Sequence, residues 1–86
     1  MGLDTVELVM AIEDEFKISI PNAIAGRLVR LRDFQDFAVS ALRDRGEQVD
    51  PAAVWERLKR VAIAQCAFRE DQVVPGAHLV YDLGLD

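Results

Sequence analysis

The stretch Leu3-Asp-Thr-Val-Glu-Leu-Val-Met-Ala-Ile-Glu-Asp-Glu-Phe16 predicts an α-helix. It contains neither glycine nor proline, and Leu8, Ile12 and Phe16 recur at four-residue spacing, which places them on one helical face. Ile20 stands before a proline and is therefore biased toward extended backbone, so the helix is expected to end before that point. The stretch thus supplies a long amphipathic helix with an apolar face for a core.

Two further helices are predicted downstream. Residues from Leu31 to about Arg45 carry apolar side chains on one face. Asp50 is suited to an N-cap and Pro51 to the first helical position, so another helix should run from about Pro51 to Cys66. Asn22 is a candidate cap for a short turn between the first two long helices. The expected core consists of Leu8, Ile12, Phe16, Phe34, Phe37, Leu58, Val61 and Leu83.

The last part of the chain, Ala67 to Asp86, is expected to form a long ordered loop, because it contains Pro75, Gly76 and Gly84. It is too apolar for a free tail, so we expect it to lie across the helices and help to close the core. The chain shows no alternating strand pattern. The predicted fold class is all-α, a small helical bundle. The apolar residues of the loop are Val73, Val74, Leu79, Val80, Tyr81, Leu83 and Leu85.

Composition limits the function classes. With 86 residues and 51% hydrophobic side chains, the chain suffices for one domain, and a net charge of −5 argues against nucleic acid as a partner. Cys66 and His78 are the only residues of their types, so neither an internal disulfide, a metal-ligand cluster nor a catalytic pair is expected. No apolar run approaches the roughly 18 residues of a membrane span, and no secretory signal pattern is present. We expect a cytoplasmic protein that is not an enzyme.

The first predicted helix carries a second apolar group besides its core face. Leu3, Val6 and Met10 are offset from the core stripe and interleaved with acidic residues. An apolar patch rimmed by acids suits docking to a basic, apolar partner. The alternatives are that Val6 and Met10 pack under the C-terminal loop, and that acids in the first turn favour the helix dipole. The acidic residues are Asp4, Glu7, Glu13 and Asp14.

The same residues resemble the acyl carrier protein family. Leu3 to Phe16 is similar to the family's second helix, which follows the serine that bears 4'-phosphopantetheine, and Ile18-Ser-Ile-Pro21 continues the match. Val54-Trp-Glu-Arg-Leu-Lys-Arg-Val61 resembles the family's first helix. Asp82-Leu-Gly-Leu-Asp86 resembles the end of the loop that leads to the serine.

The two halves stand in reversed order, so the chain resembles a circularly permuted carrier protein with one domain over residues 1–86. Residues 1–42 resemble the family's second half, residues 43–51 form a connector, and residues 52–86 resemble the first half. In this alignment Gly2, flanked by Asp86 and Leu3, occupies the place of the attachment serine. Glycine has no hydroxyl group for the phosphodiester, so no phosphopantetheine arm and no other cofactor is expected.

The resemblance implies an interaction module without an arm, which docks to carrier-handling enzymes of fatty acid or polyketide metabolism through its acidic first helix. A genuine acyl or peptidyl carrier, modified at another position or acting within an assembly, is the alternative. A third possibility is a structural oligomer in which helices exchange between chains, so the expected state is a monomer or a helix-swapped dimer.

Overall fold

The computed structural model describes residues 3–85, and the elements in this range confirm the all-α prediction. The helices are α1 (Leu3–Phe16), α2 (Asn22–Ala25), α3 (Leu31–Asp44) and α4 (Pro51–Cys66), followed by the short 3-10 helix η1 (Glu70–Gln72). No strand occurs among these residues, although an isolated antiparallel bridge joins Arg30 and His78. The three long helices occupy the ranges that the sequence predicts.

The C-terminus of α1 is held by two arginines from other elements. Lys17 adopts a left-handed conformation with φ of 55°, and the N–H of Ile18 returns to the carbonyl of Glu13. Arg45 donates to the carbonyls of Phe16 and Lys17, and Arg57 Nη2 donates to the Glu15 carbonyl at 2.8 Å. Cations near the last carbonyls of a helix are favourable because these groups carry a partial negative charge.

The start of α4 follows the predicted capping pattern, whereas the start of α2 does not. Asp50 Oδ1 accepts the N–H of Ala52 at 3.0 Å, and Pro51 occupies the first helical position. Asn22 was expected to cap the short helix, but Asn22 is its first residue and Pro21 stands at the N-cap without a side-chain hydrogen bond. The backbone carbonyl of Pro21 accepts the N–H groups of Ile24 and Ala25, both at 2.9 Å, so this short helix starts without a side-chain cap.

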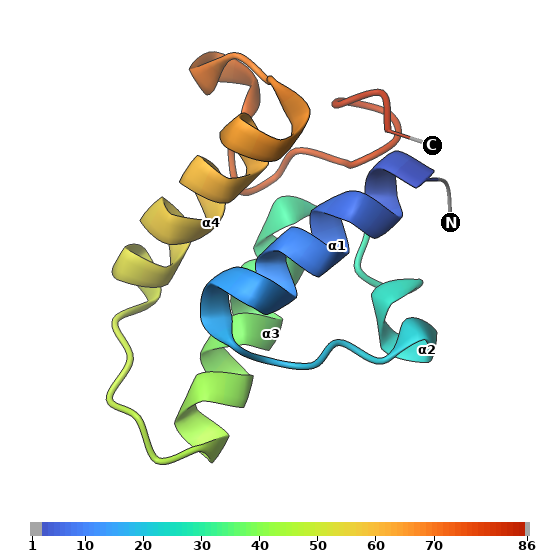
Figure 1. Ribbon diagram of the computed structural model, residues 1–86. Helices are drawn as coiled ribbons and strands as arrows, with labels where there is room; N and C mark the ends of the chain where they lie inside the picture. Colours follow the sequence, from blue (N-terminus) through green and yellow to red (C-terminus); the bar gives the residue numbers. More distant parts are fainter. Residues whose placement is uncertain (1–2, 86) are drawn as a thin grey trace.

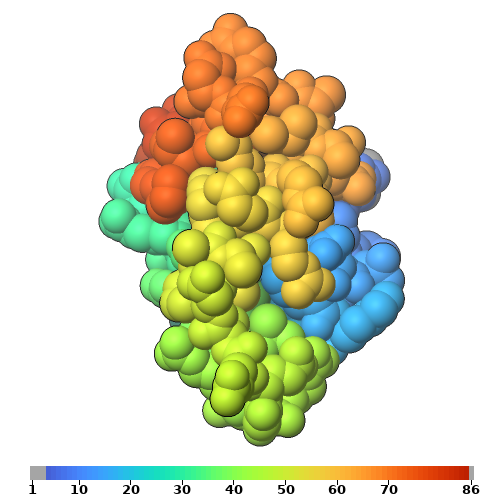
Figure 2. Space-filling model, turned by 90° about the vertical axis from the view of Figure 1, so that its left-hand side faces the viewer, coloured from blue at the N-terminus to red at the C-terminus, as the bar shows by residue number. Residues whose placement is uncertain are grey.

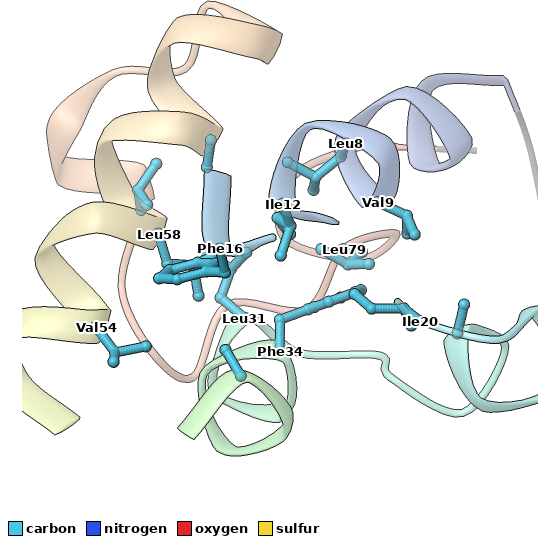
Figure 3. Packing of buried hydrophobic residues seen from close by; sticks show 14 of the residues in the cluster. Leu8, Val9, Ile12, Phe16, Ile20, Leu31, Phe34, Val54, Leu58 and Leu79 are labelled. Atoms are coloured by element: carbon cyan, nitrogen blue, oxygen red, sulfur yellow. The ribbon is translucent and has the colours of Figure 1, made fainter. Parts of the chain in front are cut away.

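The core lies where α1 and α3 pack against α4 (Figures 1 and 3). Phe16 lies beside Leu58, and Phe34 of α3 lies below them in the close-up view (Figure 3). Phe37 and Val61 were expected in the core, but they are only half-buried and pack against its margin. Each sits at the edge of its helix stripe, one position before a fully buried alanine, Ala38 or Ala62. The fully buried large side chains are Phe16, Phe34, Leu8, Ile12, Leu31, Leu58 and Val73.

Residues 67–85 cross the bundle and complete the core, as predicted for this segment. Backbone hydrogen bonds hold it against the start of α3. The N–H of Leu31 donates to the carbonyl of Ala77, and the N–H of Arg32 donates to the carbonyl of Pro75. In the other direction, the N–H of Leu79 donates to the carbonyl of Val29. Its buried residues are Val73, Ala77, Leu79, Leu83 and Leu85. Three others that were expected to cover the helices, Val74, Val80 and Tyr81, are exposed instead. The segment is one layer thick, so its residues cannot all face inward.

Two left-handed positions give a paired stability prediction. Ala67, the C-cap of α4, has a φ of 56°, which is unfavourable for a residue with a Cβ. We expect Ala67→Gly to raise the free energy of unfolding by about 0.5–1 kcal/mol. Gly84 has a φ of 70°, and a Cβ at this position would meet open space, so Gly84→Ala should lower it by about 1 kcal/mol through backbone strain alone. Urea denaturation measures the free energy of unfolding of both variants. If both substitutions change it in the same direction, the conformational explanation is wrong.

Candidate functional site

The exposed side of α1 carries a ridge that combines acidic and apolar side chains. Glu7, Met10 and Asp14 follow one another at the three- and four-residue spacing of a single helical face. Met10 is 61% exposed, and the two acids are exposed as well. We call these three residues the α1 ridge. Leu3 has the spacing to extend the ridge toward the start of the helix, but its side chain lies outside the described part.

A hollow of about 200 Å³ borders the ridge on the side of α2. Val6 is 37% exposed at its wall, whereas Val9 is buried and belongs to the core. The sequence interpretation named Val6 and Met10 but missed the α2 wall, because only the packing of α2 against α1 brings those residues together. The hollow is lined by Val6, Val9, Met10, Glu13, Ile20, Asn22 and Ala25.

Two of the predicted rim acids already have contacts within the chain. Glu13 is half-buried, and its Oε2 accepts the N–H of Ile20 at 2.8 Å, which fixes the loop after α1. Asp14 forms an ion pair with Lys17 at 3.3 Å, but both side chains are at least three-quarters exposed, so the pair contributes little to stability. Glu13 thus has a structural role, whereas the charge of Asp14 faces solvent.

The first turn of α1 faces the end of α4 and the C-terminal segment. A second hollow of about 190 Å³ is lined by Asp4, Glu7, Gln65, Cys66 and Leu85. Burial raises the pKa of the Cys66 thiol, and the negative charges of Asp4 and Glu7 raise it further. The thiol therefore stays protonated at neutral pH, which is the opposite of an activated nucleophile. Within residues 3–85, no ion pair engages Asp4 or Glu7.

His78 has a structural role in the turn that follows it. Its Nδ1 accepts the N–H groups of Val80 and Tyr81 at 3.1 and 3.2 Å, and its own N–H donates to Asp82 Oδ2 at 2.7 Å. The ring of Tyr81 lies against the imidazole, with 4.4 Å between centroids. The imidazole thus acts as a hydrogen-bond acceptor that orders residues 78–82.

The packing alternative for Val6 and Met10 predicts that the C-terminal segment covers them. The segment instead buries Leu79, Leu83 and Leu85 elsewhere, and Val6 and Met10 remain accessible.

Gly2 and Asp86, the predicted vacant attachment site, fall outside the described residues. Among residues 3–85, no helix has both the length and the apolarity to cross a membrane, and no group of histidines, cysteines and acids could hold a metal ion.

The chain was also compared with known proteins. No protein-family model matches it, and no solved structure matches it.

Proposed function

We propose that this chain is an interaction module that docks through the α1 ridge to a partner with a basic, apolar surface. The observation that carries the proposal is the exposure of Met10, 61%, and Val6, 37%, on a helix whose other face is fully buried. Exposed apolar side chains beside exposed acids supply a desolvated centre and a charged rim, which is the usual anatomy of a protein interface.

The hollow beside the ridge adds shape to this surface. It offers about 200 Å³ between α1 and α2, and its walls combine apolar side chains such as Val6 and Met10 with the polar side chains of Glu13 and Asn22. One apolar side chain of a partner fits such a volume. Glu7 and Asp14 lie on the adjacent ridge, so a partner with Lys or Arg next to its inserted side chain would match both features.

The resemblance to acyl carrier proteins suggests the class of partner, namely enzymes that handle such carriers. Leu85 lies at the same hollow as Asp4 and Glu7, so the segment similar to the family's serine loop ends beside the first turn of α1. This neighbourhood is the one that the permuted alignment requires, and it supports the proposal. With Gly2 at the serine position, the module would dock without delivering an acyl group.

The test is a binding titration against immobilised carrier-handling enzymes, beginning with a phosphopantetheinyl transferase. Glu7→Lys should weaken binding about threefold to tenfold at low salt and much less at high salt, because rim charges act on association. Met10→Ala should weaken binding about tenfold at every salt concentration through faster dissociation. Glu56→Lys and Val74→Ala make the matched changes at exposed positions elsewhere and should leave binding unchanged. Equal effects of ridge and control variants would reject the docking proposal.

A mass measurement separates the module from the alternative of a genuine carrier. Incubation with the transferase and coenzyme A should leave the intact mass unchanged, because Gly2 offers no hydroxyl group. Thr5 is buried, whereas Ser19 and Ser40 are exposed hydroxyl groups away from the expected position. A covalent arm on any of these three residues would instead support the carrier function.

A further inference from the structure

The C-terminal segment ends in a turn whose hydrogen bonds depend on one histidine nitrogen. We call residues 78–85 the C-terminal turn. His78 Nδ1 accepts the N–H groups of Val80 and Tyr81 at 3.1 and 3.2 Å, and the His78 carbonyl accepts the N–H of Asp82 at 3.0 Å. This is the arrangement of a helix N-cap, in which a side-chain acceptor satisfies the free N–H groups of a first turn.

Histidine differs from the residues favoured at an N-cap, because it changes charge between about pH 5 and 8. The neutral ring carries one proton, and here that proton is on Nε2, since Nδ1 is the acceptor. A second proton occupies Nδ1 and makes it a donor, so it can no longer accept the N–H groups of Val80 and Tyr81. Only the neutral ring of His78 can therefore cap the turn.

The charged groups around His78 offer the protonated ring another partner. Asp82 Oδ2 accepts the N–H of His78 at 2.7 Å, so a carboxylate lies within the same turn. At the start of α3, Arg30 is the bridge partner of His78, Asp33 accepts the N–H of Arg30, and Arg32 adds a positive charge. The arginines repel an imidazolium and Asp82 attracts it, so we expect the protonated ring to turn from the two amides toward Asp82.

The C-terminal turn covers one end of the core beside α1. Leu83 and Leu85 are buried, and the N–H of Leu85 donates to the Leu79 carbonyl at 2.8 Å. Leu85 also lines the hollow that contains Asp4 and Cys66, and Figure 1 shows the red end of the chain beside the start of α1. Figure 2 shows the red segment at the surface next to the residues before α3, so solvent reaches it from that side.

We propose that His78 is a pH-sensitive switch, which holds the C-terminal turn closed while the ring is neutral and loosens it when Nδ1 is protonated. As the pH falls through the range in which histidine titrates, the cap is lost and Leu85 no longer closes the hollow over Cys66. The helices keep their packing, because the centre of the core lies between Phe16 and Leu58 and does not involve the histidine. The switch does not depend on docking through the α1 ridge.

The test compares the parent with His78→Asn between about pH 5.5 and 7.5. Asparagine is favoured at an N-cap, and its side-chain oxygen accepts N–H groups without titrating. Amide exchange is measured by NMR and corrected for the intrinsic rate at each pH. In the parent, lowering the pH should reduce the protection of Val80 and Tyr81 about fivefold to tenfold, whereas in His78→Asn it should stay constant. The amide of Ala52, which Asp50 caps, should not change in either protein.

A second measurement follows the cover of the hollow. The reagent 4,4'-dithiodipyridine modifies thiols even in acid, so the rate of Cys66 modification can be compared between parent and His78→Asn at the same pH. This ratio cancels the pH dependence of the thiol itself. It should be near one at the upper end of the range and rise severalfold at the lower end.

Three results would overturn the proposal. The first is constant protection of Val80 and Tyr81 in the parent, the second is an equal loss in His78→Asn, and the third is a rate ratio for Cys66 that does not change with pH. If His78→Asn fails to fold, the parent alone decides, because the nitrogen-15 signal of Nδ1 reports its protonation. A loss of protection that does not coincide with this protonation would also reject the switch.

Discussion

Leu58→Ala is expected to lower the free energy of unfolding by about 2–5 kcal/mol. Leu58 is completely buried, and it lies against Phe16 at the centre of the packing between α1 and α4 (Figure 3). The substitution removes three carbon atoms and leaves a cavity that rigid helices cannot fill. A small domain has about 5–15 kcal/mol of stability in total, so this single substitution removes a large share of it.

Urea denaturation followed by circular dichroism measures this effect. Glu56→Ala, two positions earlier on the same helix, is exposed and should change the free energy of unfolding by less than about 0.5 kcal/mol. Similar values for the two variants would mean that α4 presents a different face to α1.

Leu79→Ala is the second substitution with a large expected effect, again about 2–5 kcal/mol. Leu79 is 3% exposed, and its N–H donates to the carbonyl of Val29 at 2.8 Å, so it anchors residues 67–85 to the start of α3. Its neighbour Val80 is half exposed and provides the control, since Val80→Ala should fall within about 0.5 kcal/mol of the parent.

Hydrogen exchange adds a local measurement to this second prediction. The amides of Leu79 and Leu31 are bonded across the contact between the segment and α3, so they should exchange faster in Leu79→Ala than in Val80→Ala. If the Leu79 variant retains full stability and slow exchange, the C-terminal segment does not contribute to the core as described.

The helix boundaries could be predicted because local chemistry determines them. Pro21 favours extended backbone at the residue before it, which keeps the chain after α1 from continuing as a helix. Asp50 and Pro51 start α4. Both signals depend on neighbouring residues and not on tertiary packing. The burial of individual side chains depends on tertiary packing instead. Phe37 and Val61 have the right spacing for the core but lie at the edges of their helix stripes and are only half-buried. The irregular segment has no periodicity to show which residues turn inward, so Val80 and Tyr81 could not be assigned.

The α1 ridge could be predicted in part, because helical spacing alone separates Met10 from the core stripe. The role of Glu13 could not, since its bond to the N–H of Ile20 depends on how the loop folds back after Lys17. The pairing of Arg30 with His78 could not be predicted either. The two residues are far apart in the sequence, and the isolated bridge between them depends on how the C-terminal segment docks on the start of α3.

The attachment of the C-terminal segment to the start of α3 also bears on the order in which the chain folds. Arg30 and Gly76, which meet there, are 46 positions apart, whereas α3 and α4 are joined by a short connector. Closing the longer loop costs more chain entropy and takes more time than pairing two adjacent helices. Helices α3 and α4 can therefore meet first, whereas the packing of α1 against α4 is nearly as non-local as the docking of the segment, since Glu15 and Arg57 are 42 positions apart. The apolar faces are covered only when both of these long-range contacts have formed, so both steps set how long the faces stay exposed to aggregation.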